Sequence, residues 1–154
     1  MINVLFVCHG NICRSTMAEF VFKDMVKKRG IADKFYIASA ATSTDEIGND
    51  IHYGTKNKLR EAGVPFEKRH ARQMTRGDYA KFDFLLGMDT PNIRNMTRIS
   101  GGDNDNKIKR LLEFTERGGD IADPWFTGNF DVTYDDVVEG CEGFIDYLAE
   151  NGLI

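Results

Sequence analysis

The stretch Cys8 to Ser15 (Cys-His-Gly-Asn-Ile-Cys-Arg-Ser) combines a thiol, a guanidinium and a run of backbone N–H groups. It follows the apolar run at residues 2–7 and precedes an amphipathic segment, so it lies at a strand-to-helix turn, where α/β proteins bind anions. With the spacing Cys-x5-Arg-Ser, the Cys8 thiolate can attack phosphorus from below a ring of N–H donors while Arg14 holds two oxygens. The pattern predicts nucleophilic chemistry on a phosphate ester, with the phosphate bound by His9, Gly10, Asn11, Ile12, Cys13, Arg14 and Ser15.

The residue types within this loop suit that chemistry. Gly10 allows the backbone to approach a ligand closely, and Asn11 tolerates the left-handed conformation that a tight loop needs. A helix N-terminus and a neighbouring arginine favour an ionised thiol at Cys8, and Ser15 can donate to its sulfur. A structural cysteine beside an unrelated arginine is the simpler alternative. A metal site is not expected, because no second pair of ligands stands at ligand spacing near Cys8 and Cys13.

Length and composition limit the class of protein. The 154 residues fit a single domain, 1–154, and 24 acidic residues against 20 Lys and Arg give a net charge of -4. This charge gives no general attraction to nucleic acid or to an anionic membrane. Three cysteines at irregular spacing suit free thiols in a reducing, cytoplasmic setting, and no apolar run is long enough for a signal peptide or a membrane span. We expect a monomer, although the sequence leaves the oligomeric state open.

Apolar periodicity predicts strands that alternate with helices. Strands are expected at 2–7, 35–39 and 82–88, with a weak candidate at 109–115. Helices are expected at 16–29, at 51–62, from 75, from 90 to about 100, and from 131 or 133 to the end, where Cys141 lies on the apolar face. Such alternation predicts an α/β fold with a parallel, doubly wound sheet and the phosphate loop between its first strand and first helix.

Two further regions do not fit regular elements. Residues 116–129 contain Gly118-Gly119, Asp123-Pro124, Trp125 and Gly128, and predict a long irregular loop, which often carries function. Residues 67–76 are strongly basic. A solvated surface is the favoured interpretation of that basic stretch, and a patch beside the phosphate loop is the alternative.

The motifs are specific enough to indicate a family. Residues 7–15, followed by Met17-Ala18-Glu19, closely resemble the low-molecular-weight protein tyrosine phosphatases. The resemblance continues over nearly the whole chain in Ser39-Ala40-Ala41-Thr42, Ala71-Arg72-Gln73, Met88-Asp89 with Asn92, and Asp123-Pro124. It implies a four-stranded parallel sheet of the flavodoxin-like or Rossmann-like kind, no metal or organic cofactor, and two-step hydrolysis of tyrosine phosphate through a phosphocysteine.

The resemblance also implies roles for single residues. Cys8 resembles the nucleophile, Arg14 the phosphate clamp, and Asp123 the general acid that protonates the leaving phenolate and later acts as base. A phenolate leaves with a conjugate-acid pKa near 10, so such an acid should contribute roughly 10²–10⁴ in rate. Asn11, Ser15 and Ser39 match positions that hold the loop's shape or tune the thiol. A reversible disulfide between Cys8 and Cys13 is a further implication.

Several positions depart from the family pattern. The family usually carries a histidine two residues before Ala-Arg-Gln, where this chain has Arg69, so the shifted His70 is the candidate to support the loop from behind. Trp125-Phe126 stands where two tyrosines are common, which excludes tyrosine phosphorylation there. Trp125 is expected to form a pocket wall against an aryl ring, with a core position as the alternative, and His9 is expected on the rim, selecting substrate or simply exposed.

Other activities remain possible on such a loop. The leading hypothesis is hydrolysis of a phosphotyrosine-containing protein or a small aryl phosphate, and a preference for phosphoarginine stays open. An arsenate reductase needs a further pair of cysteines, which the chain lacks near Gly87-Met88. A phosphocysteine carrier would store the phosphate that Arg14 and an acid help to release, and a pure binding module would turn over no ester.

Overall fold

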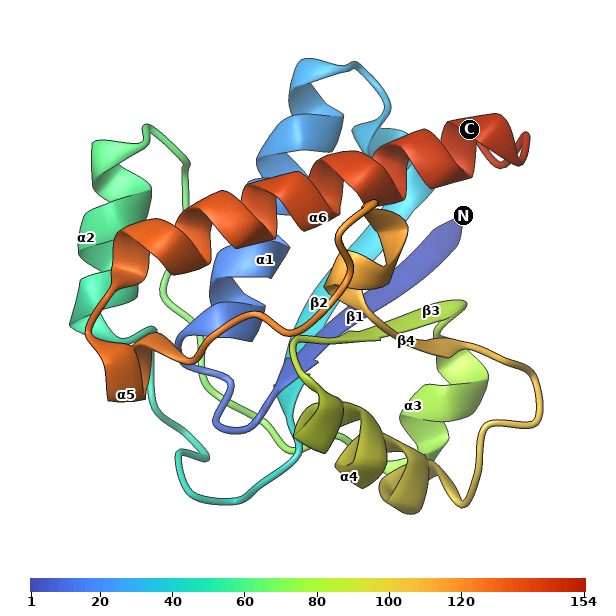
Figure 1. Ribbon diagram of the computed structural model, residues 1–154, viewed down its shortest axis with the longest axis horizontal. Coiled ribbons are helices and arrows are strands. Elements are labelled where there is room, and N and C mark those ends of the chain that lie inside the picture. Colours follow the sequence, from blue (N-terminus) through green and yellow to red (C-terminus); the bar gives the residue numbers. More distant parts are fainter.

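The computed structural model describes residues 1–154 as a four-stranded parallel sheet with helices on both faces (Figure 1). The strand order is β2-β1-β3-β4, and the α/β class, the four parallel strands and the position of the phosphate loop after β1 are confirmed. In chain order the elements are β1 (Ile2–Cys8), α1 (Arg14–Lys28), η1 (Ala32–Lys34), β2 (Phe35–Ala41), α2 (Tyr53–Glu61), α3 (Arg76–Lys81), β3 (Phe84–Gly87), α4 (Thr90–Ser100), β4 (Ile108–Arg110), η2 (Leu111–Phe114), α5 (Pro124–Thr127) and α6 (Phe130–Glu150).

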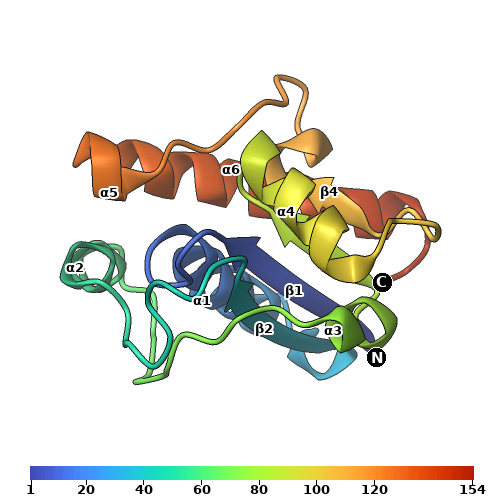
Figure 2. The ribbon, with the colours of Figure 1, turned by 90° about the horizontal axis from the view of Figure 1, so that it is seen from below.

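The strand order determines where a ligand can bind. The chain passes from β1 to β2 on one side and returns to β3 on the other side of β1, so the order reverses between β1 and β3. In open parallel sheets, ligands bind outside the carboxyl ends of the strands at such a reversal. The loops that leave β1 and β3 meet at this point. Both chain termini lie at the opposite end of the molecule from α2 and α5 (Figure 2).

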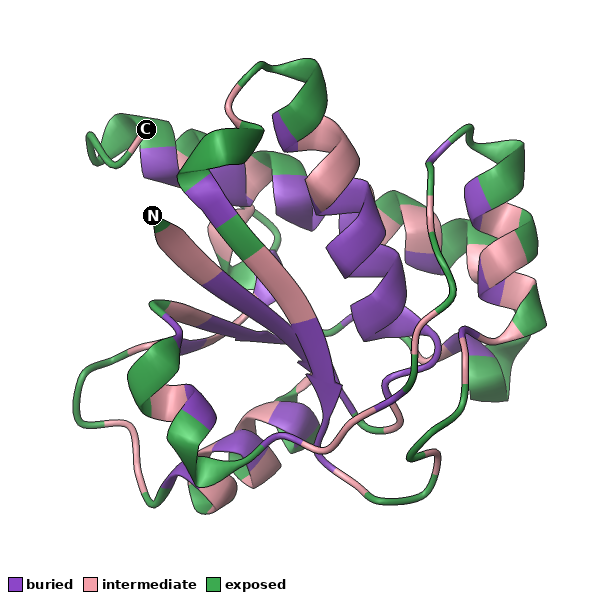
Figure 3. Ribbon diagram, turned by 180° about the vertical axis from the view of Figure 1, so that it is seen from behind, coloured by how far each residue is buried: buried purple, intermediate pink, exposed green.

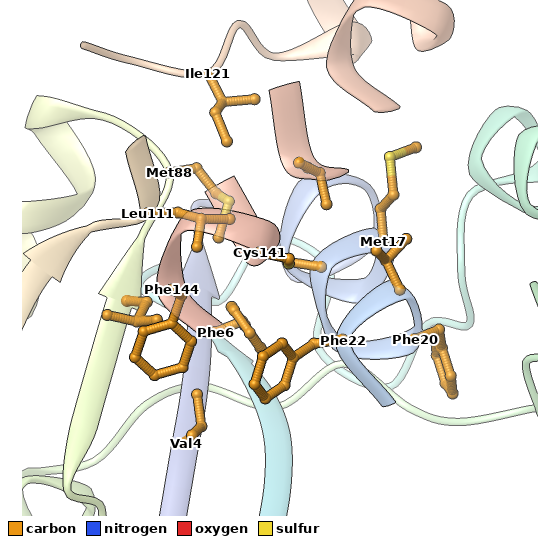
Figure 4. Packing of buried hydrophobic residues seen from close by; sticks show 14 of the residues in the cluster. Val4, Phe6, Met17, Phe20, Phe22, Met88, Leu111, Ile121, Cys141 and Phe144 are labelled. Atoms are coloured by element: carbon orange, nitrogen blue, oxygen red, sulfur yellow. The ribbon is translucent and has the colours of Figure 1, made fainter. Parts of the chain in front are cut away.

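Strand β1 forms the centre of the core because both of its faces are covered. Its residues 4–7 have no exposed surface, and they alternate between two apolar clusters. Val4 and Phe6 pack with α1 and α6, where Phe22 and Phe144 lie (Figure 4), and the alternate residues pack toward α3 and α4. Buried positions fill the sheet and the first turns of α1, while exposed ones lie on loops and outer turns (Figure 3). A continuous apolar run is what a strand buried on both faces requires.

Two expectations about secondary structure are wrong, one at residues 109–115 and one at residues 116–129. The candidate strand at 109–115 is shorter, because β4 ends at Arg110 and the chain continues as the 3₁₀ helix η2. The expected loop 116–129 contains one helical turn, α5, which Asp123 caps and Gly128 ends in a left-handed conformation. A single turn carries no apolar periodicity, so only the Asp-Pro start and the glycine stop could have indicated it.

None of the helices has the length and apolarity needed to cross a bilayer.

Helix α6 approaches η2 so closely that two glycines are required at the contact. A Cβ on Gly143 would lie 2.3 Å from the carbonyl oxygen of Phe114, and one on Gly140 would lie 2.6 Å from Cγ of Leu111. This contact fixes the start of the chain segment that leads to Asp123. The close approach therefore connects the packing of the core to the position of that carboxylate.

We predict that Gly143→Ala destabilises the protein although alanine is the better helix former. The new methyl group must push backbone atoms apart, which costs roughly 1–3 kcal/mol, whereas helix propensity alone would favour alanine by about 1 kcal/mol. Urea unfolding followed by circular dichroism measures the difference. Gly77→Ala in α3 is the matched control, because its Cβ would meet no atom closer than 3.8 Å. Equal stability of the two variants would contradict the prediction.

Candidate active site

The backbone of the phosphate loop, residues 8–15, is fixed by donors that lie beyond the loop. Asn11 adopts the left-handed conformation, with φ 59°, as its residue type allows. Five loop carbonyl groups each accept a hydrogen bond at 2.5–3.0 Å from outside the loop. The pairs are Cys8 with Thr42 N–H, His9 with Ser43 N–H, Asn11 with Arg69 Nη2, Ile12 with His52 N–H, and Cys13 with Met17 N–H.

These outward carbonyl groups turn the loop's N–H groups inward. In a trans peptide the C=O and the following N–H point in opposite directions, so each bound carbonyl directs the next residue's N–H to the other side. The first turn of α1 adds to this set, because Cys13 precedes the helix without a side-chain cap. The N–H groups without an acceptor in the protein are those of His9, Gly10, Ile12, Cys13, Arg14 and Ser15. Such a set of donors at a helix N-terminus suits one tetrahedral oxyanion.

The sulfur of Cys8 lies within this loop among polar groups. The N–H of Asn11 donates to Sγ at 3.3 Å, and Oγ of Ser15 lies 3.1 Å from Sγ. The side-chain amide of Asn11 donates to both Ser15 Oγ and Ser39 Oγ, at 2.8 Å and 2.9 Å, and Ser39 donates in turn to the buried carboxylate of Glu19. Because one chain of hydrogen bonds joins these side chains, they hold one another in place around the sulfur.

Arg14 is buried and held by groups from two other loops. Its Nη1 donates to Asp89 Oδ2 at 2.6 Å and to the carbonyl of Ile121 at 2.9 Å, and its Nη2 reaches Asp123 Oδ2 at 3.4 Å. Burial alone would lower the pKa of Arg14, but the facing Cys8, Asp89 and Asp123 outweigh it and raise this pKa above its usual value. The guanidinium is therefore permanently charged and lies between the carboxylates of Asp89 and Asp123.

Asp123 is positioned from both sides. The N–H of Ile121 donates to the carbonyl of Met88 at the end of β3, and Thr133 Oγ1 of α6 donates to the carbonyl of Ala122. One carboxylate oxygen of Asp123 accepts from the N–H of Trp125 and caps α5, while the other faces Arg14. Asp123 therefore caps a helical turn and at the same time faces Arg14 at the start of α1.

A cavity of about 190 Å³ opens over the loop. Cys8 lines it together with Asp123, Trp125 and Phe126. Trp125 is 55 % exposed, which excludes a core position, and its ring meets His52 edge to face. On the other rim His9 Nε2 lies 2.7 Å from Asp45 Oδ2. The cavity therefore has the loop with Cys8 as its floor, the side chains of Trp125 and Phe126 as an apolar wall, and the pair of His9 and Asp45 as a polar rim.

The residues behind the loop differ from the expectation. His70 is exposed, and its Nδ1 lies 2.9 Å from the carbonyl of Gly48, whereas Arg69 makes the contact to the phosphate loop. A side chain's direction along an irregular segment is not encoded in its spacing, so the one-residue choice could not be made from the sequence. Asp89 was not predicted as a site residue either. Its place at the carboxyl end of a buried strand was the available signal.

The three cysteines are free thiols in different surroundings. Burial, with a contribution from neighbouring Cys8, raises the pKa of Cys13 to about 12. Burial also raises the pKa of Cys141, which packs on the inner face of α6. No group of His, Cys, Asp and Glu side chains in the structure could hold a metal ion. Cys8 and Cys13 both line the cavity, but Cys8 is the one whose sulfur accepts the backbone N–H of Asn11.

Known proteins share this arrangement of sequence and fold. The family model described as low molecular weight phosphotyrosine protein phosphatase matches residues 3–153. The chain is 42% identical over 144 residues to the low molecular weight protein-tyrosine-phosphatase YfkJ of Bacillus subtilis, covering 92% of each chain. It is 38% identical to the low molecular weight phosphotyrosine protein phosphatase of Rattus norvegicus, covering 94% of each. The crystal structure of YfkJ superposes with a TM-score of 0.93 at 40% identity, over 98% of this chain and 96% of that one.

We predict that iodoacetamide at pH 7.5 modifies Cys8 but not Cys13 or Cys141. The raised pKa values of the latter two keep their thiols protonated, and protonated thiols do not react. Peptide mass spectrometry after brief labelling identifies the site. Inorganic phosphate should slow the reaction, because it would occupy the loop above the sulfur. Labelling of Cys13 as fast as Cys8 would contradict this description.

Proposed function

Because the chain belongs to the low molecular weight phosphotyrosine protein phosphatase family, we propose that it hydrolyses tyrosine phosphate through a covalent phosphocysteine on Cys8. The observation that carries the proposal is that Cys8 and Asp123 line one cavity and that the buried guanidinium of Arg14 contacts Asp123. A nucleophile, a charge clamp and a proton donor are the three groups that this reaction needs. The substrate is a phosphotyrosine-containing protein or a small aryl phosphate.

In the first step, the thiolate of Cys8 attacks phosphorus and forms the P–S bond. The bond from phosphorus to the phenolic oxygen breaks on the opposite side, and protonated Asp123 gives its proton to that oxygen. The inward N–H groups of the loop and the guanidinium of Arg14 bind the phosphoryl oxygens as charge develops on them. At 3.4 Å, the contact of Arg14 with Asp123 is long for a hydrogen bond, so that nitrogen is available to the phosphate.

In the second step, the carboxylate of Asp123 takes a proton from water as the water oxygen attacks phosphorus. The P–S bond breaks and the thiolate of Cys8 leaves. The N–H of Asn11 already points at this sulfur, and the hydroxyl of Ser15 accepts from the amide of Asn11, which leaves its own proton free to turn to the sulfur. Two donors on the thiolate make it a better leaving group, since they stabilise its negative charge.

The cavity walls support an aryl substrate. Trp125 and Phe126 stand beside Asp123, where the ring of a tyrosine would lie once its phosphate is bound in the loop. Nothing favours the redox alternative, because Cys141 is buried in the core and no cysteine besides Cys13 stands near Cys8 to pass on a disulfide. The free thiols support our proposal of a reducing, cytoplasmic compartment.

We predict that Cys8→Ser abolishes turnover of tyrosine phosphate and that Asp123→Asn lowers kcat by roughly 10²–10⁴. Asparagine keeps the cap on α5, so the fold should remain while the proton is lost. Steady-state kinetics with phosphotyrosine and with the phosphate of a more acidic nitrophenol separate the roles. The loss of kcat in Asp123→Asn should be smaller for the nitrophenyl ester, because its leaving group needs less protonation.

Inorganic phosphate provides the control for both variants. Asp123→Asn should retain competitive inhibition by phosphate, which uses the loop and Arg14. Turnover by Cys8→Ser would contradict the proposed mechanism. An equal loss of kcat for both esters in Asp123→Asn would show that Asp123 is not the acid. Parallel assays on phosphoserine and phosphoarginine peptides measure how far the preference for phosphotyrosine extends.

We further predict that Trp125→Ala raises KM for aryl phosphates about tenfold with little change in inhibition by inorganic phosphate. Loss of the apolar wall removes contact with the ring, worth about 0.5–1.5 kcal/mol beyond the buried area, but leaves the loop intact. Tyr53→Ala is the matched control, because Tyr53 is also exposed and packs on His52 but does not line the cavity. An equal effect of the two substitutions would show that the wall does not contact substrate.

A further inference from the structure

Arg69 reaches the phosphate loop from behind. Its Nη2 donates to the carbonyl of Asn11 at 2.5 Å, and its Nη1 donates to the carbonyl of Asn49 at 3.1 Å. The guanidinium thus joins the loop after β1 to the loop after β2. Both segments border the cavity.

The carbonyl of Asn11 depends on this side chain alone. The other four fixed carbonyl groups of the loop accept from backbone N–H groups, which no substitution of the donor residue except proline removes. Asn11 receives no backbone donor, and Arg69 is the one group that binds its oxygen. Since Asn11 is also the left-handed residue of the loop, its peptide bond is where the loop's backbone is least usual.

The orientation of this peptide bond matters for the ligand. With the Asn11 oxygen turned toward Arg69, the N–H of Ile12 must point the opposite way, into the loop. That N–H is one of the donors without an acceptor in the protein. A charged donor on the carbonyl also polarises the peptide and strengthens the N–H as a donor.

Arg69 is itself held in place. Its backbone N–H donates to Asp50 Oδ1, and Asp50 also pairs with Lys56 at 2.8 Å. Burial would raise the pKa of Asp50, but Lys56 and the N–H groups of Ile51 and Arg69 lower it to about 2. The Asp50 carboxylate therefore stays ionised throughout the pH range in which the protein works. Asp50 therefore fixes the backbone of Arg69, from which the side chain reaches the Asn11 carbonyl.

The charge of Arg69 faces the site as well. Burial lowers the pKa of Arg69 from its usual value, while the negative charges of Glu19, Asp50 and Cys8 act in the opposite direction. An arginine remains protonated at any pH at which the protein works. Its positive charge lies behind the loop, against the Asn11 carbonyl, and favours negative charge on a bound phosphate.

We propose that Arg69 is a positioning residue that holds the Asn11–Ile12 peptide so that the Ile12 N–H faces the phosphate. The inference rests on the proposed role of Cys8 as nucleophile. It makes Arg69, rather than His70, the side chain that supports the loop.

The test compares Arg69→Met and Arg69→Lys with Lys68→Met. Methionine removes both the hydrogen bonds and the charge, lysine keeps the charge without the two-armed contact, and Lys68→Met removes an exposed charge one residue away. Arg69→Met should lower kcat for aryl phosphates roughly 10- to 100-fold. It should also weaken competitive inhibition by inorganic phosphate several-fold, because the Ile12 N–H is no longer held toward the anion. Arg69→Lys should show smaller losses of kcat and of phosphate inhibition, because it keeps the charge, and Lys68→Met should match wild type.

The outcomes separate this inference from the proposed function. Wild-type kcat and wild-type phosphate inhibition in a folded Arg69→Met protein would overturn the role of Arg69 while leaving Cys8 chemistry intact. A lower kcat with unchanged phosphate inhibition in Arg69→Met would also overturn it, because the Ile12 N–H would then still bind the anion. Turnover by Cys8→Ser would instead remove the proposed function itself. If Arg69→Met does not fold, the kcat and the phosphate inhibition of Arg69→Lys decide, because lysine preserves the buried charge.

Discussion

The site depends on one constraint, the fixing of the phosphate loop's carbonyl groups by donors outside the loop. A strand-to-helix turn of this length has no hydrogen-bonding pattern of its own that would turn its N–H groups to one side. The backbone after β2, the start of α2, the first turn of α1 and Arg69 supply that pattern together. The N–H groups are therefore oriented before any ligand arrives, and preorganised donors of this kind stabilise charge without reorganising.

The same segments also bring the charged side chains to the loop. Arg14 is the first residue of α1, and its charge would repel other cations. Because of the strand order, the end of β3 lies beside it and supplies the carboxylate of Asp89 as its ion-pair partner. The carbonyl of Ile121 completes the contact, and this links Arg14 to the segment that carries Asp123. Arg14 and Asp123, the proposed clamp and acid, thus share one support. A displacement of that segment would move both groups together.

The rim of the cavity differs in chemistry from its floor. His9 pairs with Asp45 at the edge of the cavity, opposite an apolar wall formed by Trp125 and Phe126. Under the proposed function the floor binds the same tetrahedral group in any phosphate ester, whereas the rim meets only what surrounds the phosphate.

The sequence by itself determined the alternation of strands and helices, the position of the loop after β1, and the candidates Cys8, Arg14 and Asp123, because local periodicity and a dense motif encode them. Only the tertiary structure decided that Asp89 holds Arg14, that Arg69 and not His70 reaches the loop, that β4 ends at Arg110, and that Trp125 lies at the surface. These facts depend on which distant segments meet and which way each side chain turns. Neither is fixed by spacing along the chain, since both follow from the strand order and from packing between elements far apart in sequence.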